Sequence, residues 1–350
     1  MLAIIGTVGV PACYGGFETL VENLLDKNDP EVLVYCSSKQ YSAKLETHKN
    51  AQLRYIDLNA NGVQSIPYDV LSMMDAVRRG ADTILVLGVS GAIIIPFLRW
   101  FTKVKIVTNI DGLEWRRDKW GKLAKGYLKW AESLAVRFSH EVVADNQAIA
   151  DYVCAEYKKS SHVIAYGGDH AVVDALSEKT PEHSFALGLC RIEPENNVHL
   201  ILEAFVQSQL ALKFVGNWNS SPYGQQLKAK YSQYPNITIL DPIYDLAKLS
   251  LLRGACVLYV HGHSAGGTNP SLVEMMHFGK PIVCFDCNYN RATTEGAALY
   301  FKDVGELVEL IDEFDPQGNS THQVASQMIE IANRRYTWSI VKEQYFDLCR

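Results

Sequence analysis

The sequence predicts an α/β protein built from two doubly wound domains in tandem. Three observations lead to this fold class. The chain has 350 residues, which is more than one ordinary core needs. Short runs rich in β-branched residues alternate with helical segments, a pattern typical of parallel sheets covered by helices on both faces. The alternation stops once, near the middle of the chain, and then starts again.

The first half contains seven expected strands separated by helices. The strands are expected at 2–6, 32–36, 53–57, 83–88, 104–109, 141–145 and 162–166. The helices are expected at 17–27, 68–79, 119–138 and 146–157. The order of these elements predicts one complete parallel sheet before residue 170.

The alternation stops after Gly167-Gly168-Asp169, where the charged stretch 177–183 has no strand pattern and predicts a linker. Six further strands are expected at 185–189, 212–216, 237–240, 256–260, 281–285 and 298–301. A last helix, at 336–348 with Thr337 as its N-cap, has no strand after it, so we expect it to pack back onto the first domain. The expected domains are therefore 1–170 and 171–335, with 336–350 as the returning helix.

Composition and charge exclude several classes of protein. The net charge of −6 argues against general nucleic-acid binding, and no run of about 18 apolar residues could span a membrane. The N-terminus lacks a basic region, so no signal peptide is expected. The eight cysteines are scattered, which suits a cytoplasmic location. Cys284 and Cys287 form a CxxC pair without a second pair, so a zinc or redox role is the weaker interpretation.

Ligands of such sheets bind beyond the carboxyl ends of the strands, and with two domains the expected site is the cleft between them. The first loop of interest runs from Gly6 to Glu18 and opens a helix at Gly16. Its glycines allow a ligand to approach the backbone, although a plain glycine turn is an alternative. The spacing is not the GxGxxG of a dinucleotide site.

The second loop, 108–120, leaves the fifth strand and gathers carboxylates, arginines and tryptophans. Sugar-binding sites combine aromatic faces with carboxylates that accept hydrogen bonds from hydroxyls. The alternative is a solvated helix start with Asp111 or Asp118 as N-cap. We favour a functional role for the Asp111-Gly112 and Glu114-Trp115 cluster.

Two loops of the second domain favour phosphate binding. Arg191, in the loop 190–197, can make a two-pronged contact with a phosphate, or an ion pair with Glu193 or Glu195. The glycine-rich loop 261–269 opens a helix near Pro270, and its backbone N–H groups could cradle a diphosphate without a metal. Glu274 could accept hydrogen bonds from a ribose, or serve only the helix N-terminus.

The segment HSAGGTNPSLVE, together with CRIEPENN and the opening GTVGVPACYGGFETLVE, resembles retaining GT-B glycosyltransferases of family four, and in particular bacterial rhamnosyltransferases. The resemblance covers essentially the whole chain. It implies two Rossmann-like domains facing a central cleft, with the donor on the second domain and the acceptor on the first. It also implies retention of anomeric configuration, and no cofactor or metal.

The resemblance further implies a hexosyltransferase. It would move L-rhamnose from dTDP-L-rhamnose to a polyprenyl-diphosphate-linked saccharide during synthesis of capsule or cell-wall polysaccharide. The implied catalytic residues are Asp111, Glu114 and Arg191. The implied donor-binding residues are Gly15, Gly16, Arg191, Asn196, His263, Ser264, Gly266, Gly267, Thr268, Asn269, Ser271 and Glu274. The implied acceptor-binding residues are Tyr14, Phe17, Glu18, Trp115 and Arg117.

Three positions depart from the family pattern. The first of the two glutamates in the donor loop is replaced by Gly266, and the lysine of the diphosphate-binding pair is replaced by Asn196. The histidine that contacts the sugar's 6-hydroxyl in relatives has no counterpart near Asp111, which agrees with a 6-deoxy sugar. The mechanism implied is electrostatic: cations and backbone donors stabilise the departing diphosphate, which helps to deprotonate the acceptor.

Three other functions fit the same pattern: a glycosyltransferase with a UDP-sugar donor, a GT-B-type UDP-sugar epimerase, and a non-catalytic sugar-nucleotide-binding assembly protein. A lipid-linked acceptor would require contact with the inner membrane face. The apolar segment 92–101 and the basic residues between 103 and 129 suit interfacial docking through the first domain. The alternative for 92–101 is an ordinary helix buried under the sheet.

Overall fold

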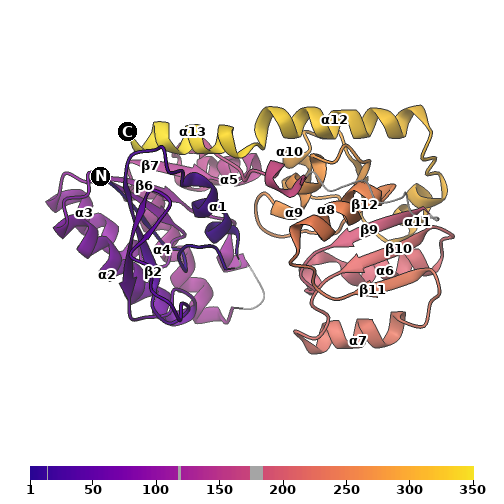
Figure 1. Ribbon diagram of the computed structural model, residues 1–350, viewed down its shortest axis with the longest axis horizontal. Helices are drawn as coiled ribbons and strands as arrows, with labels where there is room; N and C mark the ends of the chain where they lie inside the picture. Colours follow the sequence, from indigo (N-terminus) through magenta and orange to yellow (C-terminus); the bar gives the residue numbers. More distant parts are fainter. Residues whose placement is uncertain (14, 117–119, 174–183) are drawn as a thin grey trace. The chain divides into compact units, whose positions relative to one another are not determined.

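The computed structural model describes residues 1–13, 15–116, 120–173 and 184–350 (Figure 1). The chain divides into two compact units. Unit 1 consists of residues 1–165 and 338–350, and unit 2 of residues 166–337. Each unit is a twisted sheet of mainly parallel strands with helices between them, which confirms the predicted α/β class.

Unit 1 contains an eight-stranded sheet in the order β3-β4-β2-β1-β5-β6-β7-β8. The strands are β1 (Leu2–Ile5), β2 (Val32–Ser37), β3 (Thr47–His48), β4 (Ala51–Ile56), β5 (Thr83–Leu87), β6 (Lys105–Asn109), β7 (Glu141–Ala144) and β8 (His162–Val163). All six residues of β2 and all five of β5 are buried, as expected for strands covered on both faces. The central strand β1 pairs with both, Leu2 lying opposite Val32 and Thr83.

The helices of unit 1 include the last helix of the chain. They are α1 (Gly16–Leu24), α2 (Ser65–Arg78), α3 (Ile95–Phe101), α4 (Lys122–Phe138), α5 (Gln147–Tyr157) and α13 (Trp338–Cys349). Helix α13, yellow in Figure 1, lies against α1, β5 and β6. The Thr83 hydroxyl donates to the Cys349 carbonyl at 2.9 Å, and Lys342 pairs with Asp26 at 3.6 Å. These contacts attach the end of the chain to unit 1.

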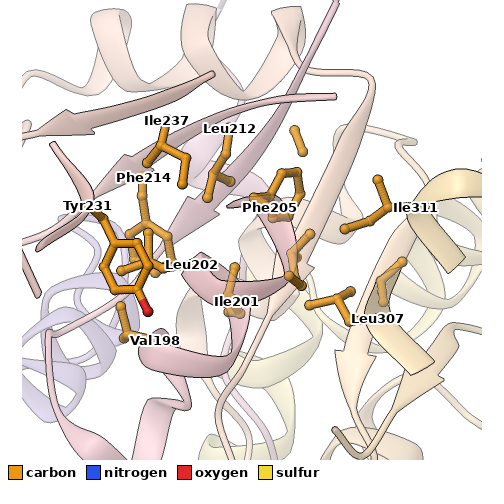
Figure 2. Close-up of a cluster of buried hydrophobic side chains, with 14 of the residues drawn as sticks. Val198, Ile201, Leu202, Phe205, Leu212, Phe214, Tyr231, Ile237, Leu307 and Ile311 are labelled. Atoms are coloured by element: carbon orange, nitrogen blue, oxygen red, sulfur yellow. The ribbon is translucent and has the colours of Figure 1, made fainter. Parts of the chain in front are cut away.

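Unit 2 contains a six-stranded parallel sheet in the order β11-β10-β9-β12-β13-β14. The strands are β9 (Phe185–Leu189), β10 (Ala211–Val215), β11 (Ile237–Leu240), β12 (Leu258–His261), β13 (Ile282–Phe285) and β14 (Leu299–Phe301). The helices are α6 (Val198–Val206), α7 (Pro222–Tyr231), α8 (Leu246–Ala255), α9 (Pro270–Met276), α10 (Asn288–Thr293), α11 (Val304–Asp312) and α12 (Asn319–Arg335). Figure 2 shows one core cluster of this unit, in which Leu202 and Phe205 of α6 meet Phe214 of β10 and Leu307 of α11.

Several boundaries differ from the prediction. The short antiparallel strand β3 was not predicted, because its two residues carry no periodic signal; it pairs His48 with Ala51 across a turn at Lys49, whose φ is 52°. The strand expected at 162–166 ends at Val163. The last helix begins at Trp338 rather than 336, because Tyr336 closes α12 and donates its buried hydroxyl to the Thr293 carbonyl at 2.8 Å. The predicted linker 177–183 lies outside the described residues.

Candidate functional site

Three adjacent strands of unit 2 end at the same edge of the sheet. Strand β12 pairs in parallel with β9 and with β13, so the loops after Leu189, His261 and Phe285 emerge side by side. The carboxyl edge of a parallel sheet is where ligands of such folds bind. The loops 190–197 and 262–269, which carry most of the predicted donor residues, therefore meet at one place.

The buried side chain of Asn196 connects these two loops by hydrogen bonds. Its side chain is buried, with the residue 2% exposed. The amide nitrogen donates to the Arg191 carbonyl at 2.7 Å, and the amide oxygen lies 2.7 Å from Nδ1 of His263. Both polar groups of Asn196 are thus used within the protein. In this structure the side chain of this predicted donor residue therefore connects the two loops.

The residues after β12 are held by further hydrogen bonds. The backbone N–H and the hydroxyl of Ser264 both donate to the Glu195 carbonyl, at 3.0 and 2.8 Å. The Asn290 amide donates to the His263 carbonyl at 2.8 Å. Side chains of the predicted donor residues His263 and Ser264 are therefore directed toward neighbouring loops. These bonds hold the start of the loop in place against its neighbours.

The loop then turns at Gly266 and starts helix α9. Gly266 has a φ of 108°, which residues with a Cβ adopt only at a cost. The Asn269 side chain caps the helix by accepting from the Ser271 backbone N–H at 3.0 Å, and Pro270 occupies the first helical position, as predicted. Thr268 is buried beside them. Gly266, Gly267 and Thr268 thus form a fixed backbone turn at the carboxyl edge of the sheet.

Glu274 lies on α9, one turn after this loop. Its Oε2 accepts a hydrogen bond from Nη2 of Arg253, a residue of α8, and its Oε1 lies 3.5 Å from Nε2 of His170. Arg253 is 2% exposed, whereas the Glu274 side chain is 16% exposed. The carboxylate is therefore fixed by a buried cation, and it does more than favour the helix N-terminus. Burial lowers the pKa of His170, with the carboxylate of Glu274 opposing that shift.

Arg191, in contrast to the buried Arg253, is exposed to solvent. Its side chain is 47% exposed, and its Nη1 lies 3.8 Å from Oε1 of Glu193. An exposed pair of this kind holds its cation weakly. The guanidinium of Arg191 can leave Glu193 and meet an anion at the edge of the sheet, so the ion pair and the phosphate contact are compatible uses of the same residue.

His261 ends β12 beneath this site. It is fully enclosed, and burial lowers the pKa of its imidazole to about 3, so the ring is neutral at physiological pH. Its Nε2 has no hydrogen-bond partner in the described part of the chain. Over the same residues, no group of three or more His, Cys, Asp or Glu side chains is arranged to hold a metal ion. Cys284 and Cys287 are free thiols.

The first glycine-rich loop of unit 1 follows β1. Glu18 is buried and turns back to this loop, where its Oε1 accepts from the Thr7 hydroxyl at 3.1 Å and the Val8 N–H at 2.8 Å. A Cβ on Gly15 would lie 1.8 Å from Oε2 of the same carboxylate. Phe17 packs near Gly88, after β5. Glu18, predicted to bind the acceptor, is engaged in holding its own loop, and Gly16 begins α1 as predicted.

The loop after β6 carries the predicted catalytic carboxylates. Asp111 has a φ of 60°, and its N–H donates to the Asn109 side-chain oxygen at 2.8 Å. The Asn109 amide in turn donates to the Tyr345 hydroxyl of α13 at 2.6 Å. Glu114 begins a short 3-10 helix (Glu114–Arg116) and accepts from the Trp120 indole at 3.2 Å. Asp111 is therefore held in a left-handed conformation by a relay from the last helix, and it does not cap α4.

Trp115 belongs to a cluster that sequence reasoning missed. Its indole donates to Glu132 of α4 at 2.9 Å, and Glu132 also accepts from the hydroxyls of Tyr152 and Tyr157 at 2.7 and 2.6 Å. The ammonium of Lys129 lies 4.8 Å from the centre of the Trp115 ring. The cluster fixes Trp115 and orients its ring. Tyr14 and Arg117, also predicted to bind the acceptor, lie outside the described residues.

Arg253 and Glu132 were not predicted, although each left a signal. Arg253 is the one charged residue in the apolar run 249–256, and a charge in such a run is costly unless it is paired. Glu132 occupies the buried face of α4 together with Ala131 and Ala135. In both cases the signal is a charge at a core position, and the partner is too distant in sequence to be identified by spacing.

Comparison with known families gives two matches, one mainly over unit 1 and one within unit 2. Residues 1–169 match a domain of unknown function (DUF1972), and residues 175–329 match the family described as glycosyl transferases group 1. A comparison with curated proteins gives no match. The family match in unit 2 includes all the loops of that unit described above.

Solved structures share the architecture of the whole chain. Sucrose-phosphate synthase of Thermosynechococcus elongatus matches with a TM-score of 0.82 and 14% identity, over 99% of this chain and 97% of that one. Anabaena HepE in complex with UDP matches with a TM-score of 0.75 and 17% identity, over 99% and 98%. A glycosyltransferase of Rickettsia africae matches with a TM-score of 0.72 and 12% identity, over 99% and 96%. The chain thus has the GT-B fold, and its residues 175–329 are similar to the glycosyl transferases group 1 family.

Proposed function

We propose that the chain is a glycosyltransferase that takes a sugar from a nucleoside diphosphate sugar bound to unit 2. The observation that carries the proposal is the loop 262–269. The side chains of His263 and Ser264 are turned to Asn196 and Glu195, and the turn at Gly266 offers backbone donors at the carboxyl edge of the sheet. Exposed Arg191 and fixed Glu274 belong to the same family-matched domain and supply a cation for phosphate and an acceptor for hydroxyls.

The proposed donor is dTDP-L-rhamnose, and a UDP-sugar is the second candidate. The rhamnose assignment is supported by the sequence resemblance and by the absence of a histidine next to Asp111. The UDP alternative is supported by HepE, which has been solved with UDP and with UDP-glucose. Both donors present the same diphosphate, so the proposed contacts of Arg191 and the loop backbone are common to them.

The reaction breaks the bond between the sugar's anomeric carbon and the diphosphate oxygen, and forms a bond from that carbon to the acceptor hydroxyl oxygen. The hydroxyl proton passes to the departing diphosphate, and the configuration is retained. Arg191 and the backbone N–H groups stabilise the charge that develops on the diphosphate. Asp111, Glu114 and Trp115 of unit 1 are the proposed acceptor-side residues, and no metal is proposed.

A thermal-shift panel tests the donor. The ligands are dTDP, dTDP-rhamnose, UDP, UDP-glucose, UDP-N-acetylglucosamine and GDP-mannose, each with wild type, Arg191→Ala and Glu274→Ala. A ligand at about 100 times its dissociation constant stabilises the protein by about 2.7 kcal/mol, which is measurable. Selective stabilisation by dTDP ligands, lost in both variants, supports the proposal. Stabilisation by UDP ligands alone would mean that the donor is a UDP-sugar and not dTDP-L-rhamnose. No response to any nucleotide contradicts donor binding.

Arg334→Ala is the matched control. Arg334 lies on α12 of the same unit, has a half-exposed side chain, and pairs with Glu295 at 2.7 Å. Its removal should leave every nucleotide response unchanged. Transfer to acceptor excludes a non-catalytic binding protein, and reversible isomerisation of a UDP-sugar without acceptor would favour the epimerase.

The proposed acceptor is a saccharide linked to a polyprenyl diphosphate, reached through an apolar patch on unit 1. The patch lies on three adjoining elements, the 3-10 helix Ala92–Ile94, α3 and α4. Its exposed side chains are Ile93, Phe97, Trp100, Phe101, Leu123 and Trp130. Trp100 and Phe101 are 69% and 70% exposed, whereas Ile95 and Leu98 of the same segment are buried. The segment 92–101 therefore buries one face and exposes the other, so an ordinary packed helix remains the alternative to interfacial docking.

The charge around the patch favours an anionic lipid surface. Residues 92–138 contain ten basic and four acidic residues, in a chain with a net charge of −6. Aromatic side chains next to lysine and arginine are typical of interfacial binding. Among the helices of residues 1–13, 15–116, 120–173 and 184–350, none is long and apolar enough to cross a bilayer. Flotation with liposomes containing anionic lipid tests this contact, and the absence of binding at low salt would contradict it.

A further inference from the structure

We propose that Arg253 is a positioning residue for Glu274, so that the buried Arg253–Glu274 pair presents one carboxylate oxygen to a hydroxyl of the donor's nucleoside sugar. The inference rests on the proposed function, because it assigns a substrate group to the same site. It adds a residue that lies outside the glycine-rich loop and outside every motif of the sequence.

The two carboxylate oxygens of Glu274 have different surroundings: one is bound by Arg253, and the other has no close partner of that kind within the ranges that the structure describes. Arg253 approaches from α8 and donates to Oε2. The remaining oxygen, Oε1, lies 3.5 Å from Nε2 of His170, which is longer than an ordinary hydrogen bond. A carboxylate oxygen has two acceptor sites. The Oε1 atom is therefore the one that can accept from a ligand hydroxyl, while Oε2 holds the group in place.

Burial makes the pair an effective anchor. Arg253 is 2% exposed, and its Nε has no partner among the described residues, so the guanidinium depends on Glu274 for its charge pairing. A buried arginine cannot relax into solvent as Arg191 can, and breaking such a pair is costly. The Glu274 side chain keeps 16% exposure, which is enough for contact with a ligand. The pair thus combines a fixed inner partner with an accessible outer oxygen.

The backbone under Glu274 is fixed as well. A Cβ on Gly168 would lie 2.7 Å from the Glu274 nitrogen, so this segment packs directly on α9. The Gly168 N–H donates to the Tyr336 carbonyl at 2.7 Å, and the same carbonyl lies 3.0 Å from Nε2 of His277. Helix α9 therefore has little freedom to move when the side-chain pair is altered, and the orientation of the carboxylate becomes the main variable.

A double-mutant cycle on nucleotide binding tests the inference. Dissociation constants for UDP and dTDP are measured by calorimetry for wild type, Arg253→Met, Glu274→Gln and the double variant. We expect each single variant to weaken the preferred nucleotide about tenfold, the order expected when one charge-assisted hydrogen bond is lost. The double variant should bind no more weakly than Glu274→Gln, because Arg253 acts only through that carboxylate. Arg253→Lys should retain part of the affinity.

Two outcomes overturn the inference. If Arg253→Met binds like wild type, or if the two losses multiply in the double variant, Arg253 does not act through Glu274. Arg253→Lys, measured alone and in combination with Glu274→Gln, gives the same comparison if Arg253→Met fails to fold. Arg334→Met, which removes an exposed arginine of unit 2, is the control. A wild type that binds neither UDP nor dTDP overturns the proposed function itself, a result distinct from multiplying losses in a protein that binds.

Discussion

The glycine-rich loops of the two units differ in what surrounds their glycines. In unit 1, a Cβ on Gly6, Gly9 or Gly15 would lie 2.0 Å from the Leu87 carbonyl oxygen, 2.6 Å from the Cys36 sulfur, or 1.8 Å from a Glu18 oxygen. In unit 2, a Cβ on Gly262, at the start of the loop, would likewise lie 2.2 Å from the Asn196 carbonyl oxygen, but the atom nearest to a Cβ on Gly266 would be Nε2 of His263, at 3.3 Å. The first loop needs glycine because its own protein fills the space, whereas Gly266 needs it mainly for its φ of 108°.

This difference separates two uses of glycine that look alike in sequence. Glycines packed against backbone and core side chains close the loop after β1, and Glu18 completes that closure from α1. The turn at Gly266 keeps open space on its outer side, as a loop that binds a diphosphate must. The comparison predicts that changes at the packed glycines of the first loop act on stability, and that a change at Gly266 acts on nucleotide binding.

The largest effect is expected for Gly6→Ala. The added methyl group meets the backbone of Leu87, and alanine is strained at a φ of 91°. Overpacking and strain together should reduce the free energy of unfolding by about 4 kcal/mol. Urea denaturation followed by circular dichroism measures the loss, and hydrogen exchange of β1 and β5 locates it in unit 1.

Gly80→Ala is the control for the contact. Gly80 has a φ of 79°, but nothing lies within 4 Å of its added Cβ. Gly80→Ala should lower the free energy of unfolding by about 1–2 kcal/mol, from strain alone. Equal losses at Gly6 and Gly80 would show that packing against Leu87 contributes nothing, and the distinction between the two loops would fail.

The second-largest loss of stability is expected for Glu18→Ala. The substitution removes the acceptor of the Thr7 hydroxyl and of the Val8 N–H, both in a largely buried setting. Leaving these donors without partners should cost about 2 kcal/mol of stability. Nucleotide affinity in calorimetry should not change. A variant with native stability but weaker nucleotide binding would assign Glu18 to a ligand instead of to its loop.

The third prediction concerns acid sensitivity in unit 2. Burial lowers the pKa of His261 to about 3, while an unfolded histidine titrates near 6.5. Between these values the unfolded state binds more protons, so stability falls as the pH drops below about 6.5. The slope from this one group is about 1.4 kcal/mol per pH unit. In His261→Gln this slope disappears, which urea denaturation between pH 7 and pH 4.5 would show; an unchanged slope would contradict the neutral, enclosed state of His261.

The parts of the fold that sequence could predict are those with local causes. The starts of α1 at Gly16 and of α9 at Pro270 follow from a glycine or proline next to an apolar run, and the parallel sheets follow from buried β-branched strands. The strand that was missed, β3, has two residues and depends on its partner. Loop positions in unit 2 were predictable because strand order alone brings the ends of β9 and β12 together.

Side-chain roles were harder to predict because their causes are distant in sequence. The resemblance predicted that Asn196 binds the donor, whereas in the structure its side chain bonds to His263, 67 residues away. Arg253 and Glu274 are separated by 21 residues, and no spacing rule pairs them. Hydrogen bonds of this kind depend on the exact packing of α8, α9 and the loops, which a hydrophobic pattern does not encode.

The smallest effect on stability, and the sharpest test of the comparison, is expected for Gly266→Ala. The methyl group has room apart from Nε2 of His263 at 3.3 Å, so the free energy of unfolding should fall by about 1–2 kcal/mol, as for Gly80→Ala, mainly from strain at a φ of 108°. Affinity for the preferred nucleoside diphosphate should fall about tenfold or more, because the methyl group occupies the side from which a diphosphate reaches the backbone donors. Calorimetry and urea denaturation on the same preparation measure both quantities. If stability collapses as in Gly6→Ala while affinity persists, the glycines of both loops serve packing, and the donor site must be sought away from the loop 262–269.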